Sequence, residues 1–151
     1  MRHIDLIVVH CSATRSSAFI GASDIREWHI KRGWRDIGYH FVVRRDGIVE
    51  NGRAENDIGA HTKGHNRHSI GICLVGGLDD EGNIVEGFDN AFTHAQKRSL
   101  LTLVTNLRQK YPGADVQGHR DLSPDIDGDG IIEEWEWVKA CPCFNASEIL
   151  T

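Results

Sequence analysis

One stretch near the end of the chain combines two kinds of metal-binding side chain. It covers residues 121–143 and reads "DLSPDIDGDGIIEEWEWVKACPC". Carboxylates alternate through its first half, and two thiols, Cys141 and Cys143, lie at its end. Carboxylate oxygens are the ligands that Ca²⁺ prefers, whereas thiolates combine with imidazoles to bind Zn²⁺. The stretch is therefore compatible with one metal site, with two sites, or with a polar loop beside a pair of thiols.

The acidic half has the register of the calcium loop of an EF-hand. Counted from residue 125, acidic residues stand at positions 1, 3, 5 and 12, and glycine stands at position 6. Glycine at position 6 allows the sharp turn, the carbonyl at position 7 binds the ion, and the glutamate at position 12 binds with both oxygens. This pattern predicts calcium ligands at Asp125, Asp127, Asp129, Ile131 (through its carbonyl) and Glu136.

The alternative interpretation of this segment is a solvated acidic turn, which is the usual meaning of a cluster of charges. The residues before it, "GHRDLSP", are few and include a proline, so they do not provide the entering helix of an EF-hand. We therefore expect a single EF-hand-like loop inserted in another scaffold.

The thiols have possible partners in two histidines that lie far from them in the sequence. His10 ends one apolar run and His119 follows another, so both are expected at strand ends, where they can meet at one edge of a sheet. Two neutral imidazoles and a thiolate such as Cys141 form a Zn²⁺ set that leaves a fourth position for water. Each histidine alone could instead be an ordinary core or surface residue. A Cys-Pro-Cys disulfide would be strained, so we expect reduced thiols or ligands.

The elements that must position these side chains alternate between strands and helices. Apolar runs predict the strands, Asp46-Gly47 predicts a hairpin turn, and a capping box of Thr93 and Gln96 predicts the start of the longest helix. We expect one α/β domain over 1–151, with a mixed central β-sheet flanked by helices and the EF-hand-like loop inserted near its C-terminus. The expected strands cover 4–10, both sides of the hairpin within 38–53, 70–77 and 114–119; the expected helices cover 24–32 and 93–111; the inserted loop covers 125–136.

Composition excludes some classes of partner. The 151 residues include 17 basic and 22 acidic ones, a net charge of -5, and no basic run exceeds two residues. Nucleic acid is therefore not expected as a partner. The first apolar run spans only about five residues, too short for a signal peptide or a membrane span. We expect a monomer that stays in the cytoplasm until it is released or delivered to its site of action, without insertion into a membrane.

Five motifs together resemble one known family, in order and spacing. These motifs are "VHCSAT", "IREWHIKRGWRDIGYHFVVRRDGIVENGR", "GAHTKGHNRHSIGICLVGG", "FTHAQ" and "KACPCF". With them, the chain is similar over nearly its whole length to the phage T7 lysozyme type of N-acetylmuramoyl-L-alanine amidase, a zinc amidase family that also includes peptidoglycan recognition proteins.

The resemblance implies a role for particular residues. The matching positions make His10, His119 and Cys141 the zinc ligands, and they make Tyr39 and Lys139 catalytic. Two residues in "GAHTKGHN", His61 and Asn66, correspond to a loop that lines the substrate groove. Two departures stand out: Cys143 replaces a serine of the T7-type enzyme, and the acidic loop is inserted where that enzyme has only a few residues between histidine and lysine.

These observations lead to a functional hypothesis. A zinc-dependent enzyme would hydrolyse the amide bond between the lactyl group of N-acetylmuramic acid and L-alanine in peptidoglycan. Zn²⁺ makes this possible at neutral pH because it lowers the pKa of a bound water towards about 7. The chain would be a phage or prophage endolysin, or a toxin delivered to the cell wall. The alternative from another class is a non-catalytic peptidoglycan-binding module that keeps the groove without a hydrolytic metal.

Overall fold

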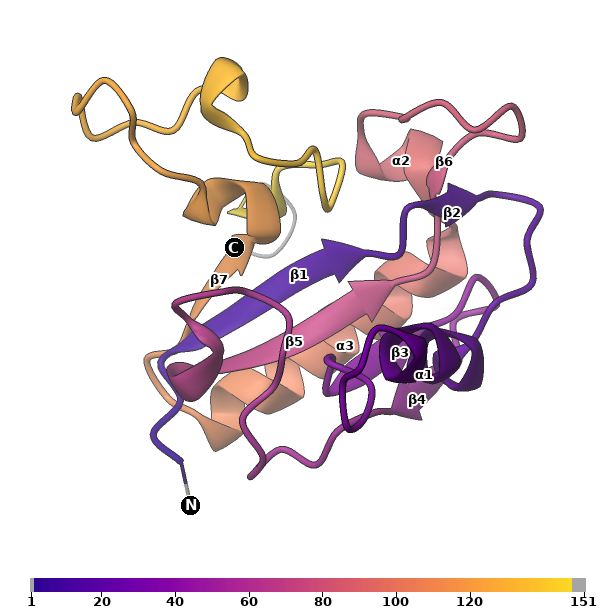
Figure 1. The fold of residues 1–151 in the computed structure, drawn as a ribbon, viewed down its shortest axis with the longest axis horizontal. Coiled ribbons are helices and arrows are strands. Elements are labelled where there is room, and N and C mark those ends of the chain that lie inside the picture. The colour runs from indigo at the N-terminus through magenta and orange to yellow at the C-terminus, as the bar shows by residue number, and fades with distance from the viewer. Residues whose placement is uncertain (1, 148–151) are drawn as a thin grey trace.

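The computed structural model describes residues 2–147 and shows an α/β domain built on a five-stranded sheet (Figure 1). The strand order is β4-β3-β5-β1-β7, and only β4 runs antiparallel to its neighbour. The expected mixed sheet is therefore confirmed. The strands are β1 (Leu6–Cys11), β3 (Phe41–Val43), β4 (Val49–Asn51), β5 (Ser69–Leu74) and β7 (Asp115–Gly118), with a small separate sheet of β2 (Thr14–Arg15) and β6 (Gly77–Leu78).

The two central strands are the most apolar segments of the chain. All residues of β1 and β5 are buried, as expected for parallel strands that are covered on both faces. The hairpin predicted at Asp46-Gly47 joins β3 to β4, and Gly47 has a φ of 87°, which a glycine adopts at little cost.

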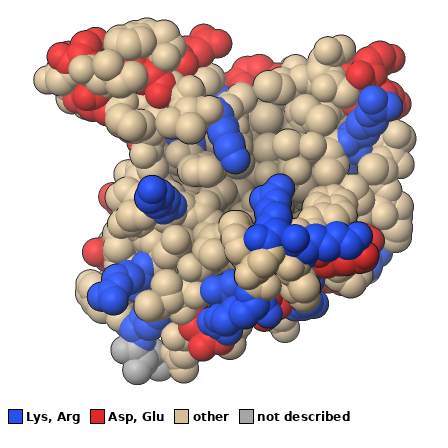
Figure 2. Space-filling view, in the orientation of Figure 1, with Lys and Arg blue, Asp and Glu red and all other residues tan. Residues whose placement is uncertain are grey.

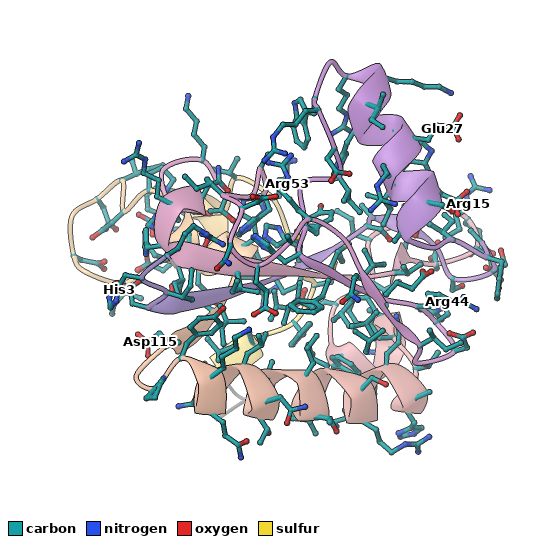
Figure 3. The ribbon with its side chains drawn as sticks, turned by 90° about the horizontal axis from the view of Figure 1, so that it is seen from below. His3, Arg15, Glu27, Arg44, Arg53 and Asp115 are labelled. Atoms are coloured by element: carbon teal, nitrogen blue, oxygen red, sulfur yellow. The ribbon has the colours of Figure 1, made fainter. Side chains whose placement is uncertain are left out.

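Helices cover the two faces of the sheet (Figure 3). Helix α3 (His94–Lys110) packs beneath it through Leu100, Val104 and Leu107, and α1 (Ala22–Lys31) packs on the other face through Ile25. The predicted capping box begins α3: Thr93 Oγ1 accepts from the amide of Gln96, and Gln96 Oε1 accepts from the amide of Thr93. Among residues 2–147, no helix combines the length and apolar character needed to cross a bilayer.

The chain leaves the sheet after β7 and forms an irregular extension. A 3₁₀ turn, η2 (His119–Leu122), precedes the acidic loop, and a second, η3 (Glu134–Glu136), forms its last residues. The loop projects beyond the strand ends as the orange segment of Figure 1. No helix enters this loop, as the proline before it suggested. The remaining short elements are α2 (Phe88–Ala91) and η1 (Asn66–His68).

Candidate active site

The sheet register brings the first two predicted ligands together. Strands β1 and β7 are parallel neighbours, and Val9 pairs with Gly118. The next residues along the chain are His10, still in β1, and His119, the first residue of η2, and their rings lie side by side with centroids 4.6 Å apart. The predicted meeting of two strand-end histidines therefore follows from the pairing of β1 with β7.

Cys141 reaches the same point from the far end of the extension. The amide of Arg120 donates to the carbonyl of Cys141 at 2.9 Å, and the amide of Cys11 donates to its Sγ at 3.1 Å. These two bonds hold the backbone and the sulfur of Cys141 beside the ends of β1 and β7. Ligand atoms of His10, His119 and Cys141 all lie within 4.8 Å of one another.

Electrostatics keep the two imidazoles neutral, which is the form that binds a metal. Burial, followed by the neighbouring His61, holds the pKa of His10 well below its ordinary value. Burial and then the charge of Lys139 also lower the pKa of His119. Both rings can therefore offer a lone pair at neutral pH.

A cleft of about 260 Å³ opens over this cluster. Tyr39 and Lys139 both line this cleft, and the ring of Tyr39 lies 5.1 Å from that of His10. Burial raises the pKa of Tyr39 well above its ordinary value, so the phenol keeps its proton. The cleft thus holds a neutral hydroxyl donor and an ammonium group beside the metal-binding cluster.

The two residues expected to line a substrate groove occupy different positions. His61 lies against the cluster, with its Nδ1 3.0 Å from His10 Nε2, while also lining the cleft. Asn66 lines an adjoining hollow, but its Oδ1 is occupied: it accepts from the amides of His61 and Thr62, each at 2.9 Å. Both side chains therefore make contacts within the protein that the sequence did not indicate.

The acidic loop is closed by its own carboxylates. Asp125 accepts from the amides of Gly128 and Gly130, and Asp127 and Asp129 each accept from the amide two residues later. Glu136, only 2% exposed, accepts from backbone amides on both sides of the loop. Carboxylates of Asp125, Asp127 and Glu136 come within 4.8 Å of one another.

A second carboxylate group adds a residue that the sequence analysis missed. Glu133 joins Asp127 and Asp129 in this group. A hydrogen bond with Glu136, together with burial, raises the pKa of Glu133 to about 7. Glu133 stands at position 9 of the EF-hand register, which supplies a ligand in such loops, so counting one position further would have found it.

The loop projects away from the cleft. Figure 2 shows acidic side chains gathered on this lobe, while Lys and Arg side chains surround the hollow beside it. At the base of the lobe, Arg120 is 5% exposed, forms an ion pair with Glu86 at 2.8 Å and stacks over the ring of Trp137 at 3.9 Å. The acidic cluster and the His/Cys cluster are therefore two separate groups of side chains.

An α/β domain that gathers two imidazoles, a thiol, an ammonium group and a phenol in one cleft has the construction of a metal-dependent hydrolase. Comparison with known proteins supports this class. The family model of N-acetylmuramoyl-L-alanine amidases matches residues 1–142. The chain therefore belongs to the N-acetylmuramoyl-L-alanine amidase family, and the resemblance indicated by the motifs is confirmed.

Individual relatives are similar over most of the chain. The endolysin of Escherichia phage T7 is 47% identical over 141 residues, which cover 93% of this chain and 82% of that protein. The endolysin of Enterobacteria phage T3 is 46% identical with the same coverage. Among solved structures, the endolysin amidase LysCS from Clostridium intestinale is 30% identical, with a TM-score of 0.73 over 98% of this chain and 82% of that one.

Proposed function

We propose that this chain hydrolyses the amide bond between the lactyl group of N-acetylmuramic acid and L-alanine in peptidoglycan, as a zinc-dependent amidase over residues 1–151. The observation that carries the proposal is the convergence of His10, His119 and Cys141 at the floor of a cleft that also contains Tyr39 and Lys139. The relatives named endolysin favour action on the cell wall by a phage or prophage protein. We propose that the chain acts as a monomer and is released from the cytoplasm.

The donor set fits Zn²⁺. Two neutral imidazole nitrogens and one sulfur within 4.8 Å of one another match the three-ligand arrangement of catalytic zinc sites. When bound there by His10, His119 and Cys141, zinc would supply a water of lowered pKa and a Lewis acid for the amide carbonyl.

The remaining cleft residues act on the substrate directly. Attack on an amide places negative charge on the carbonyl oxygen, and the Lys139 ammonium, which lines the cleft, would stabilise that charge. The buried Tyr39 phenol stays protonated, so it can donate a hydrogen bond to the attacking water or pass a proton. The hollow next to the cleft, formed in part by His61 and Asn66, extends the surface on which the peptide would lie.

The experiment is hydrolysis of a muramyl peptide by the purified protein, with release of the L-alanine amino terminus as the readout. We expect release by the parent and loss in His119→Ala, together with the loss of bound zinc. Full zinc occupancy without release would favour the alternative, a non-catalytic peptidoglycan-binding module. Absence of zinc binding by the parent would overturn the proposal.

We also propose that the loop at 125–136 binds Ca²⁺ through the carboxylates of Asp125, Asp127, Asp129 and Glu136 and the carbonyl of Ile131. The register of the loop and the proximity of Asp125, Asp127 and Glu136 support this assignment. Because the loop lies outside the cleft, the ion would stabilise the extension rather than take part in the hydrolysis.

A further inference from the structure

We propose that His61 is a positioning residue, which fixes the ring orientation and the tautomer of His10 for metal binding. This inference rests on the proposed function, because it concerns the zinc site of the amidase. It assigns His61 a role besides any contact with the substrate. The evidence lies in the hydrogen bonds of the ring, the space provided for it and the anchoring of its loop.

The hydrogen bonds form a short chain that leads away from the metal-binding cluster. His10 Nε2 lies 3.0 Å from His61 Nδ1, and the rings meet edge to face at 90°. His61 Nε2 lies 3.2 Å from Ser69 Oγ, a side chain with no exposure to solvent. Thr62 Oγ1 lies 3.1 Å from His61 Nδ1 and 3.3 Å from His10 Nε2, so it belongs to the same group of contacts. In the tautomer in which His61 donates from Nε2 to Ser69 Oγ, its Nδ1 is an acceptor and His10 Nε2 can donate to it.

This tautomer leaves one nitrogen of His10 free to bind the metal. A neutral imidazole carries one proton, so a His10 that donates from Nε2 has its lone pair on Nδ1. The geometry therefore points to Nδ1 as the metal-binding atom of His10. Histidines that bind metals commonly donate their other N–H to a fixed acceptor, and removal of that acceptor costs about 10- to 100-fold in metal affinity.

The fold leaves space specifically for the His61 ring. A Cβ at Gly71 would lie 2.6 Å from two atoms of this ring, and a Cβ at Gly59 would lie 2.7 Å from Cδ2. Gly71 is in the interior of the central strand β5, where glycine weakens a strand and commonly marks a close approach. Here the approaching group is the imidazole of His61, so the ring packs directly on the backbone of the strand.

The loop that carries His61 is held from its other end. Asn66 Oδ1 accepts from the amides of both His61 and Thr62, which fixes the backbone on which the ring stands. Arg53, labelled in Figure 3 on the α1 side of the sheet, donates to the carbonyl of Ile58 at 2.8 Å and so anchors the approach to the loop. A side chain with this many restraints is suited to orienting a neighbour.

Three variants separate positioning from general packing. His61→Leu keeps the volume of the side chain but removes the acceptor Nδ1. In His61→Asn, the amide oxygen of the new side chain can lie near the position of Nδ1. His65→Leu is the matched control, since His65 is in the same loop but its ring packs against His68. The zinc dissociation constant is measured by chelator competition on the whole protein. The visible absorption of the cobalt-substituted protein is measured alongside, and metal-free thermal stability shows whether each variant folds.

We expect the zinc dissociation constant of His61→Leu to rise about 10- to 100-fold, with an altered cobalt spectrum. His61→Asn should recover most of the affinity, and His65→Leu should match the parent. Parent-like zinc affinity in His61→Leu, or equal losses in His61→Leu and His61→Asn, would overturn the inference while leaving the amidase intact. Failure of the parent itself to bind zinc would instead overturn the proposed function.

Discussion

Calcium binding by the acidic loop can be tested through thermal stability. The perturbation is the addition of Ca²⁺ to the parent and to a variant, Asp127→Asn with Glu136→Gln, that retains an acceptor at each position but loses both charges. This choice matters because Glu136 already accepts from the amides of Ile126 and Glu133 in the absence of an ion. Because these bonds use different oxygens, Gln at position 136 keeps one acceptor and loses the other, whereas alanine would break both bonds and lower stability further for a reason unrelated to calcium.

The expected magnitude follows from the ligands that the loop offers. The register of the loop is complete, but no helix enters the loop and it has no paired partner loop among residues 2–147. We therefore expect weak binding for a loop of this kind, with a calcium dissociation constant of about 10⁻⁴ M. At about 10 mM Ca²⁺, one hundred times that constant, the folded state gains about 2.7 kcal/mol. For a chain of this size each kcal/mol moves Tm by about 2–4 °C, so Tm should rise by about 5–11 °C.

The assay is a thermal melt of the protein in Ca²⁺, in Mg²⁺ and in NaCl at matched ionic strength. The NaCl arm is needed because cations also screen repulsion within an acidic chain of net charge -5. Glu81→Gln removes an exposed carboxylate outside the loop and should keep the full calcium shift. A parent without a calcium-specific shift, or a double variant that shifts as much as the parent, would refute the assignment.

Three further outcomes are expected. Lys139→Met should lower kcat about 10²- to 10³-fold and leave the zinc content unchanged, because the variant loses the ammonium that stabilises the developing oxyanion. An unchanged kcat in the steady-state assay would contradict that role. Calcium affinity, measured by titration calorimetry, should fall as the pH is lowered from 8 to 6. The reason is that Glu133 has a pKa of about 7 and its protonated form is a poor ligand. In Glu133→Gln, the affinity should depend less on pH. Gln96→Leu should cost about 3 kcal/mol or more in urea unfolding, because Gln96 Nε2 donates to the carbonyls of Val43 and Val75 in the core; a loss below about 1 kcal/mol would argue against these bonds.

Periodicity and local signals were sufficient to predict most of the fold. The buried strands β1 and β5 are continuous apolar runs, and α3 begins at its capping box, because such features depend on residues close together in the sequence. The pairing of Val9 with Gly118 depends instead on strand order, which no local pattern encodes. Local patterns could therefore place His10 and His119 at strand ends, where they can meet, but their neighbouring positions depend on the pairing of β1 with β7.

The contact of His61 with His10 was not predictable for a related reason. It requires the loop at 61–66 to turn back onto β5, and that path depends on the amide oxygen of Asn66 and on the absence of a side chain at Gly71. In the sequence these residues are only a polar loop and a glycine within an apolar run. The structure shows why these residues matter: the ring of His61 occupies the space beside Gly71, where a side chain would otherwise lie.

The base of the acidic lobe explains how an insertion between two cleft segments can be tolerated. The amide of Arg120 bonds to the carbonyl of Cys141, and the amide of Val138 donates to Ser123 Oγ at 3.1 Å. These bonds join the two sides of the base, so His119 and Cys141 stay together whatever the conformation of the loop beyond it. Since the cost of closing a loop grows only slowly with its length, the extra residues add little penalty. The stretch at 121–143 thus serves two sites that share a boundary, and calcium should affect the stability of the lobe far more than the arrangement of the zinc ligands.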